Sequence, residues 1–310
     1  MGRYLVGRLL QAVLVLALLL VAVFFLIRLV PGDPVRIVLG PRASQASVDI
    51  VRHQLGLDRS TLSQFGSFAS GAVHFDFGRS IVQSTPVSTL IAPRIAPSLF
   101  LIGYGLLVAF LIAIPLALVS ALHKDRPSDH AIRGGSTIAL AMPPFWLGIL
   151  LIYFVGLKLG LFPTSGYGQG FWDHLRSLTL PAVTLGVSVS PVLLRTLRSS
   201  LLETFGEGYV EAALAHGLTK RRVLYRHVLR NSLAATITVA GVLVGALLSY
   251  AVVVESVFGI AGLGSLLVQS VSTRDFPTVQ GLTFLFALCV VVVSVVTDVV
   301  YVVLDPRIKL

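Results

Sequence analysis

Residues 231–254 read NSLAATITVAGVLVGALLSYAVVV, a stretch of 24 residues without a charged side chain. A helix rises 1.5 Å per residue, so about 20 residues cross the ~30 Å hydrocarbon core of a bilayer. A charged side chain at the bilayer centre costs roughly 2.5–3.5 kcal/mol, so long uncharged runs mark membrane spans. We therefore expect this stretch to be a transmembrane helix.

Five further uncharged runs have between 18 and 29 residues. They occupy residues 9–27, 95–123, 134–157, 177–194 and 276–297. Each is long enough to cross a bilayer as a helix. Together the six runs predict an all-α transmembrane fold, a bundle of six helices.

The composition of the whole chain agrees with a membrane protein. Only 12% of its 310 residues are charged, whereas roughly a quarter are charged in a soluble domain. Apolar residues make up 55%, and the mean hydropathy is +0.89. So few charges could not cover the core of a soluble protein, and a disordered chain has the opposite composition. The single cysteine, Cys289, excludes a disulfide-stapled fold.

Two other uncharged segments need separate interpretations. The first run has 19 residues, longer than the roughly 7–15 of a signal-peptide core, and no small-residue cleavage site follows it. We expect it to remain as a helix. A seventh run, residues 256–273, contains Gly259, Gly262 and Gly264. It predicts an irregular or re-entrant outer segment between the fifth and sixth spans.

Lysine and arginine are distributed unevenly between the two sides of the predicted membrane. With six spans both termini lie on one side, whose tails and short loops carry 14 of these residues. The short loops of the other side carry three, Lys158, Arg176 and Arg274. Cytoplasmic loops are enriched in Lys and Arg, so we expect both termini in the cytoplasm. The net charge of +10 then reflects this bias and anionic lipid, not nucleic-acid binding.

The predicted spans divide the chain into three parts. These are residues 1–30 (tail and first helix), 31–94 (an extracytoplasmic loop region) and 95–310 (a core with helices 2 to 6). Within the outer loop, residues 48–55 have helical periodicity and are followed by Gly56, which predicts a short amphipathic helix. The longest cytoplasmic segment is residues 195–230, between the fourth and fifth spans.

Residues typical of enzyme chemistry are nearly absent. The four lysines do not follow a glycine, so the phosphate-binding pattern G-x-x-x-x-G-K-[ST] is missing. The seven histidines show neither an H-x-x-x-H pattern nor pairing with cysteine, which leaves a metal site unsupported. Only Glu255 and Asp298 lie near a span as candidate proton carriers. We therefore expect a chain that is not an enzyme and that draws its energy from elsewhere.

The segment 195–230 contains the most informative motif. Glu207 to His216 can form a short helix, and Gly217 is well placed to end it in a left-handed turn. A second short helix then carries five basic residues, Lys220, Arg221, Arg222, Arg226 and Arg230. We call residues 207–230 the cytoplasmic bracket. Small side chains at its tip would let another protein approach the backbone closely. The alternative is a solvated helix-turn-helix, basic only because it is cytoplasmic.

The pattern Glu211-Ala212-Ala213-x-x-x-Gly217 resembles the EAA loop of permeases in ATP-binding-cassette (ABC) importers. The family's downstream I-x-L-P element falls on residues 227–230, where only Leu229 matches. In that family the loop forms a coupling helix that sits in a cleft of the ATPase subunit. The resemblance implies an ATPase-coupling set of Glu211, Ala212, Ala213, Gly217, Leu218, Arg221 and Arg222.

Other segments resemble the dipeptide, oligopeptide and nickel branch of this family. They are LVPGDP (29–34), HQLGLD (53–58), VVVESVFGIAGLGSLLV (252–268), RDFPTVQG (274–281) and YVVLDPRIK (301–309). The set, in this order, covers essentially the whole chain and is highly specific. The resemblance implies a six-helix permease subunit in the inner (cytoplasmic) membrane of the cell. The long first loop is typical of the B-type permease of such a pair.

The resemblance also implies partners. A second, homologous permease would form a heterodimer with this chain, two cytoplasmic ATPase subunits would bind ATP and Mg, and an extracytoplasmic solute-binding protein would deliver the solute. The implied function is ATP-driven import of dipeptides, oligopeptides or peptide-like solutes. A same-family permease for nickel or another solute is the first alternative. A self-contained secondary carrier or channel with an inert loop is the second, and it belongs to a different class.

The translocation path would run between the two permeases and be lined by spans two to six and by the outer segment 256–273. Candidates at its mouth are Tyr250, Glu255, Phe258, Arg274 and Asp275. For each of them the alternative is a packing role, or a carboxylate hydrogen-bonded to backbone. No residue is assigned to a metal or to catalysis.

Overall fold

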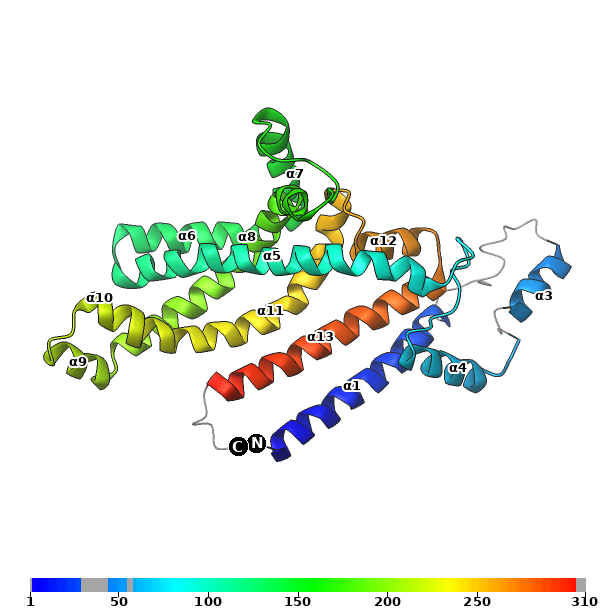
Figure 1. The fold of residues 1–310 in the computed structure, drawn as a ribbon, viewed down its shortest axis with the longest axis horizontal. Helices are drawn as coiled ribbons and strands as arrows, with labels where there is room; N and C mark the ends of the chain where they lie inside the picture. Colours follow the sequence, from blue (N-terminus) through cyan, green and yellow to red (C-terminus); the bar gives the residue numbers. More distant parts are fainter. Residues whose placement is uncertain (1, 29–43, 55–57, 305–310) are drawn as a thin grey trace. The chain divides into compact units, whose positions relative to one another are not determined.

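The computed structural model describes residues 2–28, 44–54 and 58–304 (Figure 1). Among these residues the elements are helices, joined by turns and by one isolated antiparallel bridge between Arg79 and Pro86. In chain order they are α1 (Gly2–Arg28), α3 (Gln45–Gln54), α4 (Thr61–Val73), α5 (Val87–Leu122), α6 (Pro127–Ala141), α7 (Pro144–Leu151), the π-helix η1 (Ile152–Lys158), α8 (Phe171–Phe205), α9 (Gly208–Ala215), α10 (Lys220–Val223), the π-helix η2 (Leu224–Leu229), α11 (Arg230–Val257), α12 (Leu263–Ser272) and α13 (Phe276–Leu304). The predicted all-α fold is confirmed.

Four helices are long and apolar enough to cross a membrane. They are α5, α8, the continuous helix of residues 220–257, and α13. The pair of helices over residues 127–158 makes a fifth candidate if it is one span. In α1 the apolar stretch Leu10–Phe25 is shorter. The multi-pass architecture is therefore confirmed, while the count of six spans stays a prediction.

The third predicted span, residues 134–157, is not one continuous helix. The chain bends by 101° between α6 and the helix that follows it. The break lies at Met142 and Pro143, both in extended conformation. Proline lacks an N–H donor and forces the residue before it out of the helical region, so the Pro143-Pro144 pair ends one helix and starts another.

The outer segments contain more helix than the sequence predicts. The amphipathic helix expected over 48–55 is present as α3, although Gly56 lies outside the described residues. The helix α4 was not expected. The segment 256–273 is irregular only up to Gly262, because α12 follows and is too short to cross a bilayer. At its start Ser265 donates to the Gly262 carbonyl and accepts from the Gly262 N–H, which caps the helix.

The chain forms two compact units. The first unit contains residues 1–97 and 261–292, and the second contains residues 98–260 and 293–310. The core of the first unit is apolar and joins helices distant in sequence. In it the α5 residues Val87 and Ile91, the α12 residues Leu263 and Leu266, and Leu282 of α13 are buried together.

In the second unit α8 is the central helix, in contact with α6, α7 and α11. Two glycines allow α5 and α8 to cross closely. A Cβ atom on Gly186 would lie 2.6 Å from Val108, and one on Gly105 would lie 2.8 Å from Leu185. Small residues at such crossings let helix backbones approach each other, which stabilises packing inside a membrane.

Candidate functional site

The cytoplasmic bracket, residues 207–230, is built from the end of α8, the short helix α9 and the start of the helix that becomes α11 (Figure 1). The helix predicted over 207–216 is confirmed as α9. The second predicted helix is confirmed at its start, but it is not short: α10, η2 and α11 form one continuous helix over residues 220–257. The bracket therefore follows α8 after a short turn at residues 206–207, and its second helix continues directly into α11.

Gly217 makes the turn between the two helices of the bracket. Its φ is +83°, in the left-handed region that L-residues rarely adopt. Its N–H donates to the Leu214 carbonyl, and the N–H of Leu218 donates to the Ala213 carbonyl, which satisfies the end of α9. Thr219 then caps the next helix by accepting a hydrogen bond from the Arg222 N–H at 3.4 Å.

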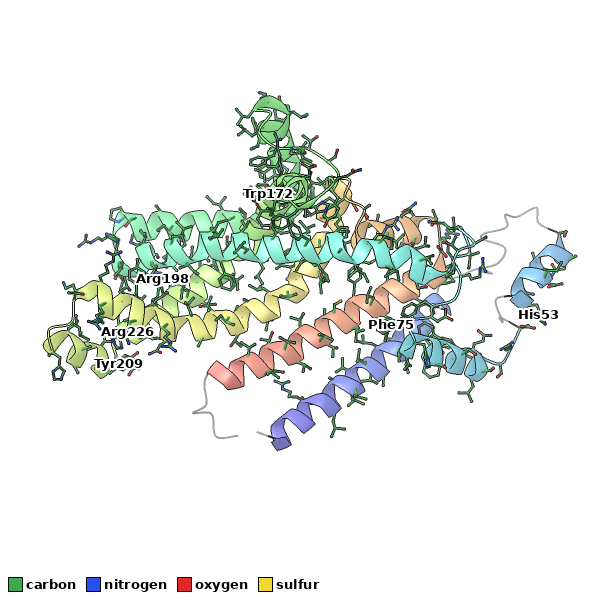
Figure 2. All side chains as sticks on the ribbon, viewed as in Figure 1. His53, Phe75, Trp172, Arg198, Tyr209 and Arg226 are labelled. Atoms are coloured by element: carbon green, nitrogen blue, oxygen red, sulfur yellow. The ribbon has the colours of Figure 1, made fainter. Side chains whose placement is uncertain are left out.

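The base of the bracket is anchored to the second unit. Val210, Val223 and Val228 are buried. The Asn231 side chain donates to the Tyr209 hydroxyl at 2.8 Å, and the hydroxyls of Thr204 and Ser232 are 3.1 Å apart in a buried pair. Figure 2 labels Tyr209 on α9 and Arg226 on η2 within this region. The first contact joins α9 to the start of α11, and the second joins the end of α8 to the start of α11, so the base of the bracket is fixed where these helices meet.

The outer surface of the bracket is open. Of the seven residues assigned to ATPase coupling, Ala213 and Leu218 are half-buried and the others, Glu211, Ala212, Gly217, Arg221 and Arg222, are exposed. The seven residues lie in α9, in the turn at Gly217 and Leu218, and at the start of α10. A Cβ atom added at Gly217 would have no other heavy atom of the described residues within 4 Å. A partner can therefore reach the backbone at this point.

Three basic residues lie in the first turn of the second helix of the bracket: Lys220, Arg221 and Arg222. The positive end of the helix dipole is at this terminus, so basic side chains there are unfavourable by roughly 0.3–1 kcal/mol each. Within the described part of the chain, none of the three forms an ion pair. Arg221 lies over the Tyr225 ring, with 6.0 Å between guanidinium carbon and ring centroid. The three basic residues therefore make this end of the bracket a positively charged surface.

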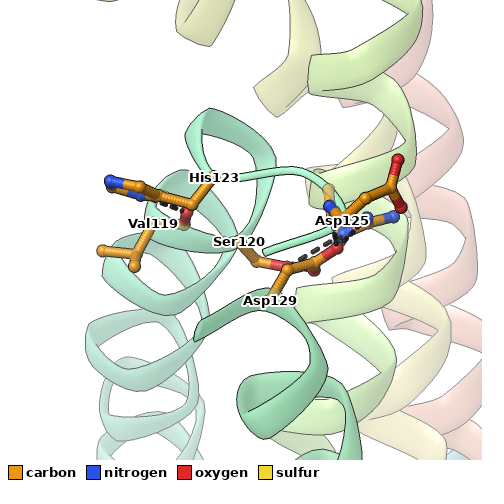
Figure 3. Close-up of polar contacts among 6 residues, drawn as sticks. Val119, Ser120, His123, Asp125 and Asp129 are labelled. Atoms are coloured by element: carbon orange, nitrogen blue, oxygen red, sulfur yellow. Dashed lines mark hydrogen bonds and ion pairs between the residues drawn. The ribbon is translucent and has the colours of Figure 1, made fainter. Parts of the chain in front are cut away.

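A buried ion pair joins the C-terminal part of α5, the start of α6 and the C-terminal part of α8. Asp129 of α6 is fully buried and accepts from the Nε and Nη2 atoms of Arg198 at 3.0 and 2.7 Å. The hydroxyl of Ser120 and the N–H of Asp125 also donate to this carboxylate, and Figure 3 shows Ser120 and Asp129 facing each other. Asp129 lies before the uncharged run 134–157. The hydrogen bond from Arg198 is the main cause that holds the pKa of its carboxyl well below its usual range.

This ion pair was not predicted from the sequence. Asp129 and Arg198 are 69 residues apart, so no local pattern joins them. The loop 124–133 contains two acidic residues, Asp125 and Asp129, but nothing in the sequence singles out Asp129 or joins it to Arg198.

Two of the substrate-path candidates take part in internal packing. Glu255 is fully buried, and Ser98 donates its hydroxyl to the Glu255 carboxylate. Phe258 is also buried, and its ring lies against Gly148, where an added Cβ atom would be 3.1 Å away. Tyr250 is half-buried. These contacts favour the packing role given as the alternative, and the lining of a path stays a prediction.

The other two candidates lie in the first unit. Asp275 is buried and accepts from the Ser80 hydroxyl, the Ile81 N–H and the Thr278 hydroxyl at 2.6, 3.0 and 2.7 Å. Its hydrogen bonds therefore connect the segment around Ser80 to the start of α13. Arg274 is exposed and has a φ of +58°. The structure thus places Asp275 in a structural role next to an exposed arginine.

Comparisons with known proteins assign the chain to a family. Residues 113–310 match the family described as "Binding-protein-dependent transport system inner membrane component". Residues 1–98 match the family of the N-terminal region of the same membrane components. Together the two matches cover nearly the whole chain.

Individual relatives agree with this assignment. The chain is 36% identical over 309 residues to the glutathione transport system permease protein GsiC of Escherichia coli K12, which covers 100% of this chain and 99% of that protein. It is 35% identical over 317 residues to a putative peptide permease protein of Brucella ovis, with the same coverage.

The fold also matches solved structures. An inward-facing structure of the MetNI methionine ABC transporter has a TM-score of 0.59 at 19% identity, over 70% of this chain and 96% of that one. A crystal structure of an amino acid ABC transporter with histidines has a TM-score of 0.51 at 17% identity, over 71% and 95%. With the full-length relatives and the two family matches, these likenesses establish that the chain belongs to the binding-protein-dependent inner membrane components, the permeases of ABC importers.

Proposed function

We propose that the chain moves peptides or peptide-like solutes across the membrane as one permease subunit of an ATP-driven importer. The observation that carries this proposal is the cytoplasmic bracket, which is exposed on its outer surface and anchored at its base to α8 and α11. A partner that binds the exposed surface can pull on both helices. The relatives' names, glutathione and peptide permease, support the class of solute.

The bracket couples to a partner ATPase through Glu211, Ala212, Ala213, Gly217, Leu218, Arg221 and Arg222. Two ATPase subunits bind ATP and Mg, and closure of the ATPase pair moves the bracket. Because the bracket follows α8 after a short turn and continues into α11, its movement changes the arrangement of both helices. The helices then alternate between outward-facing and inward-facing states.

The complete importer has further partners. A second, homologous permease completes the path as a heterodimer with this chain, which is the B-type subunit. An extracytoplasmic binding protein delivers the solute. Both termini of this chain lie in the cytoplasm, and Tyr250, Glu255, Phe258, Arg274 and Asp275 are the candidate residues at the mouth of the path.

The coupling role is tested by charge reversal on the bracket. Glu211→Lys should reduce co-purification of the ATPase subunits and abolish ATP-dependent uptake, because it replaces the acidic side chain in the first turn of α9. Membrane insertion should be unchanged. The matched control is Glu203→Lys, which makes the same charge change on an exposed residue near the end of α8. Unchanged uptake in Glu211→Lys would favour a self-contained carrier.

The solute is tested separately with the assembled importer in proteoliposomes. We expect unlabelled glutathione and dipeptides to compete with uptake of a labelled dipeptide. If Ni²⁺ is taken up in an ATP-dependent manner and peptides do not compete, the nickel alternative is correct and the peptide assignment is wrong.

A further inference from the structure

A basic cleft lies between α6 and α8 in the second unit. Its volume is about 510 Å³. Eight residues line it: His130, Arg133, Gly134, Thr137, Leu194, Arg195, Arg198 and Ser199. Figure 2 labels Arg198 beside these helices. The importer mechanism proposed above assigns no role to this cleft.

The lining has the chemistry of an anion site. Three of the eight residues are arginines and none is acidic. Arg198 is compensated by the buried carboxylate of Asp129, whereas no ion pair of Arg133 or Arg195 is present among the described residues. Arg195 donates to the Thr137 hydroxyl at 3.1 Å, which orients its guanidinium at the cleft. A guanidinium can donate two hydrogen bonds side by side to phosphate oxygens.

Neighbouring side chains do not neutralise the positive charge of Arg133 and Arg195. The Ser199 hydroxyl donates to Glu203 at 3.1 Å, so one exposed carboxylate lies a helical turn beyond the cleft. His130 adds an imidazole to the lining. Arg133 and Arg195 place two positive charges in the cleft, and the Glu203 carboxylate outside it can offset only one of them.

The position of the cleft along the helices indicates the source of the anion. Arg133 directly precedes the uncharged run 134–157, and Arg195 directly follows the run 177–194. The helix α8 is long enough to span by itself, and its uncharged run ends at Arg195, which lines the same cleft as Arg133. Both guanidiniums therefore lie near the level of the lipid headgroups. On α6, Ile138 and Leu140 are 66% and 44% exposed beyond the cleft. An acyl chain can cover these side chains while its headgroup occupies the cleft.

We propose that this cleft binds the phosphate group of an anionic phospholipid from the cytoplasmic leaflet. The volume is within the roughly 300–1,000 Å³ of small-molecule sites. Basic pockets between membrane helices on the cytoplasmic side recognise anionic headgroups in this way. The proposal depends on the cytoplasmic placement of these loops, and not on which solute the importer carries.

The test measures lipid bound to the assembled importer by native mass spectrometry in nanodiscs and after transfer to detergent. The probes are phosphatidylglycerol, phosphatidylcholine and inorganic phosphate. The variant is Arg133→Gln combined with Arg195→Gln, which spares the Arg198 ion pair. The control is Arg226→Gln combined with Arg230→Gln, which removes the same charge from exposed residues outside the cleft.

We expect the parent and the control to retain phosphatidylglycerol in preference to phosphatidylcholine, and the cleft variant to retain about tenfold less phosphatidylglycerol. An unchanged thermal midpoint would show that the cleft variant is folded. Equal retention by cleft variant and control would overturn the proposal. If inorganic phosphate displaced the lipid at equal concentration, the site would be for a soluble anion. If only the ATPase subunits, and no lipid, were lost from the cleft variant, the cleft would be a subunit contact.

Discussion

Replacing Asp129 by asparagine should destabilise the chain, because it removes the charge that compensates Arg198. The carboxylate accepts two hydrogen bonds from Arg198 and one each from Ser120 and Asp125. Asparagine keeps the shape but replaces one acceptor oxygen with an amide donor. The side chain of Arg198 is 17% exposed and would be left without its partner.

The size of this effect follows from how far the pair is buried. Removing one partner of a fully buried ion pair costs about 3–5 kcal/mol. Arg198 also lines the open cleft and can gain water, so we expect about 2–3 kcal/mol for Asp129→Asn. The purified chain in detergent should show this loss in thermal or denaturant unfolding.

A double-mutant cycle isolates the pair. Arg198→Met removes the charge that Asp129→Asn leaves uncompensated, so the double variant should cost at least about 1 kcal/mol less than the sum of the single variants. The control is Asp125→Asn, which removes an exposed carboxylate four residues away and should change stability by less than about 0.5 kcal/mol. The reasoning is refuted if Asp129→Asn is as stable as this control, or if the coupling is absent.

Three further predictions concern other contacts. Asp275→Ala should lower the unfolding free energy by about 2 kcal/mol and increase proteolysis near Ser80, since three donors lose their acceptor; unchanged proteolysis would contradict this tie. Gly241→Val should lower the thermal midpoint because its Cβ would overlap Thr297, and Thr297→Ala should restore part of the loss; no rescue would mean that the two residues do not pack together. Gly217→Asn should retain most ATP-dependent uptake, whereas Gly217→Val should lose it, because asparagine tolerates the left-handed region and valine does not; equal uptake would show that the turn geometry is unimportant.

The long helices were predictable because their signal is a simple shortage of charge. The runs 95–123, 177–194, 231–254 and 276–297 each lie within or closely match one helix of the structure. Insertion into hydrocarbon imposes this shortage on every span regardless of the tertiary packing. In the run 134–157 the shortage of charge marks an apolar stretch, but it does not report the break in the backbone at Pro143.

The bracket was predictable from local rules as well. Gly217 adopts the left-handed turn, and α9 ends just before it, as the helix-ending signal implied. The continuation of the second helix into α11 was not expected, because the basic residues up to Arg230 were read as the end of a loop. Charge marks the membrane boundary, but it does not end a helix.

The polar contacts between distant segments could not be predicted from the sequence. Asp275 and Ser80 are 195 residues apart, and Ser98 and Glu255 are 157 residues apart. Each pair forms only after the helices pack, so neither has a periodicity or spacing to detect. For this reason the sequence analysis placed Asp275 and Glu255 at the mouth of a path, whereas the structure places both carboxylates in buried hydrogen bonds.

The central claim is that the bracket transmits force from separate ATPase subunits to helices that have no energy source of their own. The most direct measurement is dipeptide uptake into proteoliposomes that contain this chain alone, or this chain with its second permease, both ATPase subunits and the binding protein, each with and without ATP. We predict uptake only in the complete assembly with ATP. Uptake by the chain alone, without nucleotide, would contradict the claim.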